Sequence, residues 1–229
     1  MDQSRAPIAT GSKPHQRGTD RSASIAAHEF VWTDSEHANG YQYILPAVAR
    51  ELREFGATNV LDLGCGNGAG TAYLAREKFP IAGCDMSSSG LLHARATHPE
   101  IVFFEHEFSN PLPPQHQQQY DAVVAVEVIE HLLLPRQLLS SALQALRPGG
   151  LLIMTTPHHG YWKNLALAVT NKFDDHWHPL RDFGHVKFFS KKTILALLTE
   201  NGFSIRNFRL VGRVPILRCS MVVSATRSL

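Results

Sequence analysis

The alternation of short apolar runs with helical stretches constrains the fold of this chain most. Strands that alternate with helices pair in parallel through right-handed crossovers, and the helices then cover both faces of the sheet. The run at 120–126 is apolar at almost every position, as expected of a strand buried on both faces. We therefore predict an α/β fold with a doubly wound, mostly parallel sheet. The five predicted strands of the alternating region are 59–64, 81–85, 101–104, 120–126 and 151–155.

Apolar spacing and capping signals predict the helices and the last two strands. Ile44, Leu45 and Val48 recur at helical spacing within 25–55, which Gly56 ends. Ser190 is a suitable N-cap for a helix that runs to Glu200. Two strand-like runs follow at the carboxyl end of the chain. The further predicted helices are 70–78, 88–96 and 135–146, and the two last strands are 203–211 and 215–225.

Composition predicts one folded domain with a disordered tail. The chain has 229 residues, 44% of them hydrophobic, which is enough for one sizeable core. Residues 1–24 are rich in Ser, Gly, Pro and Arg, so we expect them to be disordered and the domain to span 25–229. Residues 157–189 have little periodicity and many aromatic and histidine side chains. We expect this insertion to form a lid or an acceptor-binding element.

Charge and cysteine content favour a small-molecule partner in the cytoplasm. The formal net charge is +2 and no long run of like charges occurs, so nucleic acid is not an expected partner. The three cysteines form no pair at metal or disulfide spacing, which fits a reducing compartment. No apolar run approaches the ~20 residues of a membrane span, so membrane contact is expected to be peripheral at most.

A glycine-rich loop after the first strand predicts a nucleotide-type cofactor site. Gly64, Gly66 and Gly68 alternate singly, and Asp62 precedes them within the strand. Glycine lets the backbone turn tightly and approach a ligand closely. Asp85 ends the next strand about 20 residues further on, where a carboxylate can accept both ribose hydroxyls. A dehydrogenase loop is the alternative, but it would space its glycines as GxGxxG.

The fourth strand leads into a motif with two carboxylates and an imidazole. If the chain turns helical there, Glu130 and His131 share one face with Glu127. Three interpretations remain open. The side chains ligate a divalent cation that lowers the pKa of an acceptor hydroxyl. Alternatively, His131 acts as a general base, or Glu127 touches the cofactor while the other two side chains only shape the loop.

The motif at 60–68, the acid at Asp85 and the segment 146–153 resemble class I S-adenosylmethionine (SAM)-dependent methyltransferases. The resemblance implies a Rossmann-like seven-stranded sheet with a C-terminal antiparallel hairpin. It also implies that Asp62 and the glycines line the methionine moiety, Asp85 binds the ribose, and Met86 lies against the adenine. The segment that begins at Glu107 sits where the family places an adenine contact. The implied cofactor-binding residues are Asp62, Gly64, Cys65, Gly66, Gly68, Asp85, Met86, Glu107 and Glu127.

The segment 127–131, followed by Pro135 and a late histidine, is similar to the ubiquinone-biosynthesis O-methyltransferase group. It is also similar to small-RNA 3′-end 2′-O-methyltransferases, where two glutamates and a histidine of this motif hold magnesium with a distant histidine. This likeness implies Mg²⁺ or another divalent cation, with His158, His159 or His185 as the distant ligand. The implied metal ligands are Glu127, Glu130, His131 and His185.

These features together predict methyl transfer from SAM to a small-molecule acceptor, at a hydroxyl oxygen. Glu130 and His131 are the expected catalytic residues. The acceptor is expected to be aromatic or lipid-tailed, because aromatic side chains crowd the 157–189 insertion and the apolar run 165–169 suits a membrane surface. RNA 3′-end 2′-O-methylation and non-catalytic SAM binding are the alternative functions.

Overall fold

A seven-stranded sheet organises the computed structural model, which describes residues 32, 40–177, 180, 184–212 and 220–228. Its order is β3-β2-β1-β4-β5-β7-β6. The first five strands are parallel, and β7 runs antiparallel to both β5 and β6. This arrangement confirms the predicted Rossmann-like fold with its C-terminal hairpin. The strands are β1 Val60–Leu63, β2 Ile81–Asp85, β3 Val102–Glu105, β4 Tyr120–Val126, β5 Leu146–Pro157, β6 Phe203–Val211 and β7 Ser220–Arg227.

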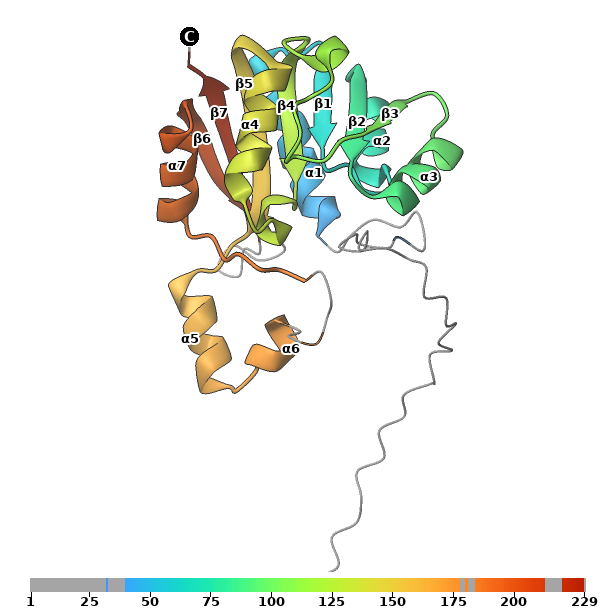
Figure 1. The fold of residues 1–229 in the computed structure, drawn as a ribbon. Coiled ribbons are helices and arrows are strands. Elements are labelled where there is room, and N and C mark those ends of the chain that lie inside the picture. Colours follow the sequence, from blue (N-terminus) through green and yellow to red (C-terminus); the bar gives the residue numbers. More distant parts are fainter. Residues whose placement is uncertain (1–31, 33–39, 178–179, 181–183, 213–219, 229) are drawn as a thin grey trace, which may run out of the picture.

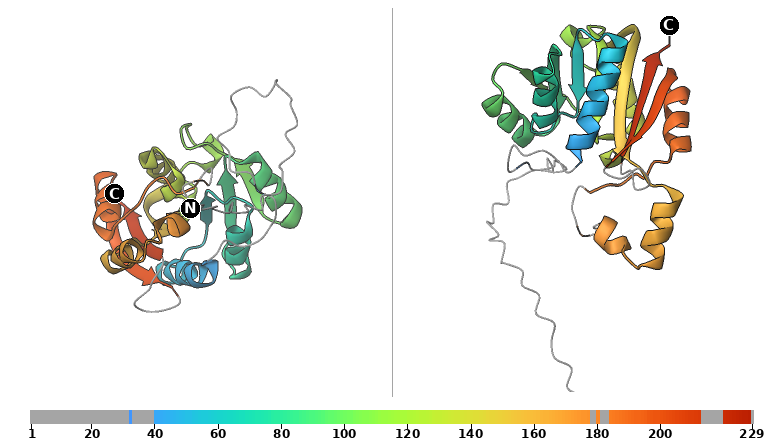
Figure 2. Two further views of the ribbon diagram at one scale, coloured as in Figure 1. Left: turned by 90° about the horizontal axis from the view of Figure 1, so that it is seen from below. Right: turned by 180° about the vertical axis from the view of Figure 1, so that it is seen from behind.

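Helices cover both faces of the sheet (Figure 1). One apolar cluster joins α4 and α7 to the central strands, and a second joins α1 and α2 to the opposite face. The view from behind shows α1 in front of the sheet (Figure 2). The sheet is thus buried on both sides, which explains the apolar sequence of β4. The helices are α1 Tyr41–Phe55, α2 Ala69–Arg76, α3 Ser88–Thr97, α4 Pro135–Ala145 and α7 Lys191–Glu200, with 3₁₀ turns η1 Pro114–His116 and η2 Ile129–His131.

Several predicted boundaries differ in the structure, and residues 215–219 of the last predicted strand lie outside the described residues. The first helix begins at Tyr41 rather than near residue 25, because Gly40 at φ 101° precedes it. Residues 25–31 and 33–39, like the predicted tail 1–24, lie outside the described residues. Strand β5 begins at Leu146, which pairs with Tyr120 before a shift in register. The chain after β4 does not turn α-helical: Glu127 has φ 55°, and a 3₁₀ turn follows.

The 157–189 insertion contains two helices, α5 Tyr161–Val169 and α6 Phe173–Trp177, where we expected little regular structure. They follow β5 and lie beyond the carboxyl end of the sheet (Figure 1). Helix α5 buries none of its residues. It is apolar around most of its circumference, so no polar–apolar period reveals it in the sequence. None of the helices in the described part of the chain is both long and apolar enough to cross a bilayer.

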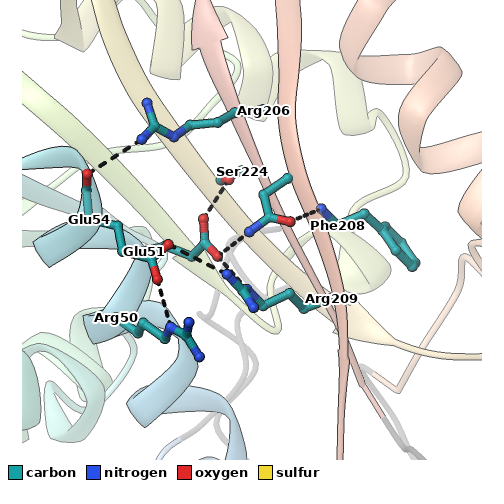
Figure 3. A network of polar contacts seen from close by, with 8 residues as sticks. Arg50, Glu51, Glu54, Arg206, Phe208, Arg209 and Ser224 are labelled. Atoms are coloured by element: carbon teal, nitrogen blue, oxygen red, sulfur yellow. Dashed lines mark hydrogen bonds and ion pairs between the residues drawn. The ribbon is translucent and has the colours of Figure 1, made fainter.

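A buried glutamate ties the C-terminal hairpin to α1 (Figure 3). The Glu51 side chain is only 2% exposed. Its carboxylate accepts hydrogen bonds from Asn207 Nδ2 and Arg209 Nε of β6, both at 2.7 Å, and from Ser224 Oγ of β7 at 2.8 Å. The charge is therefore paired and fully hydrogen-bonded, as burial requires. This network fixes the antiparallel end of the sheet against α1.

Candidate active site

The glycine loop joins β1 to α2 by a tight turn. Gly64, Gly66 and Gly68 have φ of 84°, 53° and 79°, a region that side chains with a Cβ rarely adopt. The Gly64 and Cys65 N–H groups donate to the Cys84 carbonyl at 2.8 and 3.0 Å. A Cβ at Gly64 would lie 2.7 Å from the Val128 side chain. The loop is therefore packed directly against the segment that follows β4.

Asp85, the predicted ribose ligand, ends β2 beside this loop. Its Oδ2 accepts a hydrogen bond from the Gly66 N–H, and its Oδ1 accepts one from the Ser87 N–H, both at 2.8 Å. Each carboxylate oxygen can accept more than one hydrogen bond. The carboxylate is thus oriented by backbone groups and keeps acceptor capacity for ribose hydroxyls, which fits the predicted cofactor.

Asp62, the acid within β1, is 3% exposed. Its Oδ2 accepts from Thr71 Oγ1 at 2.7 Å, and its Oδ1 has no hydrogen-bond partner among the described residues. Burial raises the pKa of Asp62 to about 7. A buried acceptor without a donor is costly, and the ammonium group of a bound amino acid moiety would satisfy it. Asp62 therefore also fits SAM.

The other predicted cofactor contacts lie at the same end of neighbouring strands. Met86 follows Asp85 and is 43% exposed. Glu107 follows β3 and accepts a hydrogen bond from Ser109 Oγ at 2.6 Å. Cys65 is buried, and burial raises the pKa of its thiol, so it packs as an apolar side chain. The carboxyl ends of β3, β2, β1 and β4 thus gather every predicted cofactor residue, as expected of ligand sites in doubly wound sheets.

The Glu127 carboxyl is held by Thr155 of β5. Thr155 Oγ1 accepts from the Glu127 N–H and donates to Glu127 Oε1, both at 2.9 Å. Burial raises the pKa of Glu127 to about 7. A positive φ in a residue with a Cβ is strained, and such strain persists only where surrounding contacts hold it. The Thr155 hydrogen bonds supply that constraint.

The structure brings Glu130, His131 and His185 together. One ligand atom from each of them lies within 4.8 Å of the other two. The Val186 and Lys187 N–H groups donate to the Glu130 carbonyl at 2.9 and 3.0 Å. These hydrogen bonds hold the preceding residue, His185, beside Glu130. Of the three histidines considered as the distant ligand, His185 is therefore the one in this group, while the Glu127 carboxylate is not part of it.

Glu130 supplies the buried end of this group, and both imidazoles are exposed. Its side chain is 1% exposed, and neither carboxylate oxygen has a hydrogen-bond partner of normal geometry among the described residues. Burial, together with the nearby Glu127 charge, raises the pKa of Glu130 well above its usual range. A carboxylate in this position needs a cation or a proton to offset its charge.

The other two candidate histidines lie within the insertion and outside this group. His158 lies beside Gly160, where an added Cβ would be 2.7 Å from His158 Nε2. The His159 ring centroid lies 5.3 Å from that of Trp177 and 5.2 Å from that of Phe188. Trp177 and Phe188 are themselves 3.8 Å apart, so this aromatic cluster holds α6 against the segment that carries His185. Tyr161 and Trp162, which we expected at an acceptor, are 72% and 75% exposed on α5.

Two aromatic residues near the site belong to no recognisable sequence motif. Tyr41 begins α1, and burial together with the charges of Asp62, Glu127 and Glu130 raises the pKa of its hydroxyl far above the usual value. Trp32 lies against the glycine loop at Gly66. Both are distant in sequence from the loop they approach, so only the tertiary structure reveals them.

Comparisons with known proteins identify the family of this chain. The family model described as a methyltransferase domain matches residues 35–207. The ubiquinone biosynthesis O-methyltransferase of Rickettsia canadensis (strain McKiel) is 24% identical over 169 residues, covering 73% of this chain and 72% of the relative. The magnesium protoporphyrin IX methyltransferase from Synechocystis PCC 6803 with bound SAH superposes with a TM-score of 0.62 at 20% identity, covering 81% of this chain and 82% of that one.

A second solved structure, the methyltransferase domain of bacterial CtHen1-CN, superposes with a TM-score of 0.61 at 23% identity, over 80% of this chain and 97% of that one. The fold is therefore shared with these solved structures, and the family match spans both the glycine loop and the Glu130 group. The chain belongs to the methyltransferase domain family, and it acts as a SAM-dependent methyltransferase.

Proposed function

We propose that the protein transfers the SAM methyl group to a hydroxyl oxygen of a small-molecule acceptor held at the Glu130 group, which consists of Glu130, His131 and His185. The observation that carries this proposal is the place of that group. It follows Val128, whose side chain packs onto Gly64 of the cofactor loop, so the acceptor and the methyl donor would meet between β1 and β4.

Positioning would be the main contribution of the chain to the reaction. With the ribose on Asp85 and the amino group on Asp62, the sulfonium methyl would point toward the end of β4. The sulfonium already provides a good leaving group, and aligning two reactants is worth about 7–11 kcal/mol in favourable cases. The acceptor hydroxyl must also lose its proton, which is the second task of the site.

The donor set of the Glu130 group suits a divalent cation. Carboxylate oxygen suits Mg²⁺ and Mn²⁺, and imidazole nitrogen suits Zn²⁺ and Fe²⁺. When bound, such a cation would lower the pKa of a coordinated hydroxyl. The buried Glu130 carboxylate, which has no hydrogen-bond partner among the described residues, supports this assignment because a cation would offset its charge. Glu127 stays a predicted fourth ligand that would have to leave Thr155.

The alternative in the same site is general-base catalysis by His131. Its imidazole is exposed, and imidazole titrates near neutral pH, so it can accept the proton of a hydroxyl that lies within hydrogen-bond reach. In this reading Glu130 orients the imidazole or the acceptor. Removal of divalent cations separates the two mechanisms, since only the first depends on them.

The class of acceptor follows from the insertion and from the relatives. Exposed aromatic and apolar side chains on α5, among them Tyr161, Trp162 and Val169, suit a flat or lipid-tailed acceptor. The curated relative named above is a ubiquinone biosynthesis O-methyltransferase. We therefore favour a phenol or catechol with an apolar tail. A cytoplasmic location and the absence of a nucleic-acid partner stay predictions.

The test is a methyl-transfer assay with labelled SAM and three acceptor classes: catechols, simple phenols and a short RNA with a free 3′ end. Each is assayed with Mg²⁺ and with EDTA, and mass spectrometry locates the new methyl group. Methylated catechol or phenol oxygen supports the proposal, and loss of activity in EDTA supports the cation. Methylation of RNA alone would replace the proposal by the RNA alternative, and transfer to carbon or nitrogen would refute oxygen as the target.

A further inference from the structure

A tryptophan outside the loop motif packs directly onto the glycine loop. The backbone N–H of Trp32 donates to Ser89 Oγ at 3.2 Å, which ties the residue to the first turn of α3. A Cβ placed on Gly66 would lie 2.4 Å from Trp32 Cζ2, and a Cβ placed on Gly90 would lie 2.9 Å from Trp32 Cδ1. The indole therefore rests against the bare backbone of two glycines.

This contact differs from ordinary core packing. Trp32 belongs to none of the three apolar clusters found among the described residues, and its side chain is only half-buried. Large aromatic rings in a core pack mainly against other apolar side chains. Here the ring lies against the backbone of Gly66 and Gly90, outside those three clusters.

The two glycines flank the carboxylate predicted to bind ribose. The Gly66 N–H donates to Asp85 Oδ2 at 2.8 Å, and the Gly90 N–H donates to Ser87 Oγ at 3.1 Å. Ser87 in turn donates its own N–H to Asp85 Oδ1. The indole thus packs on the two glycines whose N–H groups belong to the hydrogen-bond network that holds Asp85.

We propose that Trp32 forms a wall of the SAM site and contacts the adenosine half of the bound cofactor. An indole offers a large, rigid apolar surface at low entropic cost, and its face attracts both flat heterocycles and cations. Gly66 and Gly90 make room for the ring, because a side chain at either position would collide with it. Trp32 is therefore a binding residue for the cofactor, supplied from outside the glycine motif.

Tryptophan fluorescence can report this contact directly. The chain has three tryptophans, so a Trp162→Phe/Trp177→Phe variant leaves Trp32 as the only emitter. We expect SAM and SAH to shift or quench its emission equally, because they share the adenosine half, with a midpoint equal to the calorimetric Kd. If saturating SAH left the Trp32 emission unchanged in protein shown by calorimetry to bind SAH, the proposal would be overturned.

Affinity provides an independent readout. We expect Trp32→Ala to weaken SAH binding about fivefold and Trp32→Phe to weaken it less, since one lost aromatic contact is worth about 1 kcal/mol, which is about fivefold in Kd. Trp162→Ala, which removes a 75% exposed indole from α5, is the matched control and should leave cofactor affinity unchanged. Thermal unfolding without ligand checks that each variant is folded. Unchanged or tighter SAH binding by folded Trp32→Ala would contradict the assignment, the tighter case indicating that the indole competes with the cofactor.

Discussion

Three carboxyl side chains at the site are buried, and burial makes their ionised form unfavourable. Asp62, Glu127 and Glu130 all have a pKa raised by burial, to about 7 for the first two. Structures tolerate such groups where function requires them, and strongly perturbed carboxyls cluster at active sites. Each of the three would gain a favourable partner from a cationic ligand: the ammonium or sulfonium of SAM, or a divalent metal. The site is therefore expected to be strained without ligands.

Glu130→Gln tests the acceptor side of the site. The variant should bind SAM as the natural protein does, because Glu130 belongs to the group beyond the cofactor loop. Its turnover should fall about a hundredfold or more, since general acid–base or metal assistance is typically worth that much. Glu100→Gln, an exposed acid just after α3, is the control. If Glu130→Gln left turnover unchanged, the hypotheses that this motif binds a cation and that it binds the acceptor would both be refuted.

Asp62→Asn tests the cost of the buried acid through pH. Because the folded-state pKa is raised from 3.8 to about 7, the folded protein holds this proton where the unfolded chain has lost it. The stability linked to the proton is complete below about pH 4 and is lost as pH rises through about 7. We therefore expect the Tm advantage of Asp62→Asn to be larger at pH 8 than at pH 5.5. An advantage that shrinks with rising pH would contradict the raised pKa, and SAM affinity should fall in this variant.

At the scale of elements, the C-terminal hairpin depends on a polar contact as well as on its hydrogen-bond ladder. Glu51 of α1 receives donors from both strands of the hairpin, and Arg209 adds a charge pair to it (Figure 3). The antiparallel strands close the sheet on the side of β5, whose carboxyl end leads into the insertion. The network thus stabilises the strands next to β5. The insertion, which contains His185 and the aromatic cluster, follows β5.

Glu51→Ala should be strongly destabilising. It leaves the Asn207 amide and the buried Ser224 hydroxyl without their acceptor, and each buried donor left unpaired typically costs about 1–3 kcal/mol. Arg209 is partly exposed and keeps its contact with Glu54. Glu54→Ala, which removes a more exposed acid of the same helix, should cost much less stability than Glu51→Ala. Urea unfolding at neutral pH measures both variants. A cost for Glu51→Ala no larger than that of Glu54→Ala would show that the network contributes little.

On the scale of the whole molecule, strand order decides where ligands bind. The chain runs outward from β1 to β3 and then returns to β4, so the crevice for a ligand opens at the carboxyl ends of β1 and β4. The glycine loop follows β1 and the Glu130 group follows β4, so both stand at this end of the sheet. Cofactor binding should therefore couple to the stability of the entire sheet.

SAH at 100 times its Kd should raise the free energy of unfolding by about 2.7 kcal/mol, because a ligand that binds only the folded state stabilises it by mass action. Thermal unfolding with and without SAH would show this as an increase in Tm. Asp85→Ala should abolish the increase, since it removes the predicted ribose ligand and the acceptor of the Gly66 N–H. Asp121→Ala, which alters a carboxylate that accepts from Thr58 and Asn59, is the control. A full increase in Asp85→Ala would exclude Asp85 from the cofactor site.

Local patterns predicted most of the sheet. Strands 81–85, 120–126 and 203–211 have the bounds expected from their apolar runs, and the Ser190 cap is present with a hydrogen bond from the Thr193 N–H. Helix α5 was missed because an apolar helix outside a core has no amphipathic period. The early start of β5 was missed because a register shift, which depends on the partner strand, extends it past a Pro-Gly-Gly turn.

The sequence by itself determined the fold class, the cofactor loop and the family, because glycine placement and strand–helix alternation act over a few residues at a time. Only the tertiary structure decided that His185 rather than His158 or His159 joins Glu130, that Glu127 turns to Thr155, and that Trp32 rests on Gly66. These contacts join residues 28 to 57 positions apart, as in the Thr155 and Ser89 hydrogen bonds. Local periodicity carries no information about such pairs, because the folding of the whole sheet brings them together.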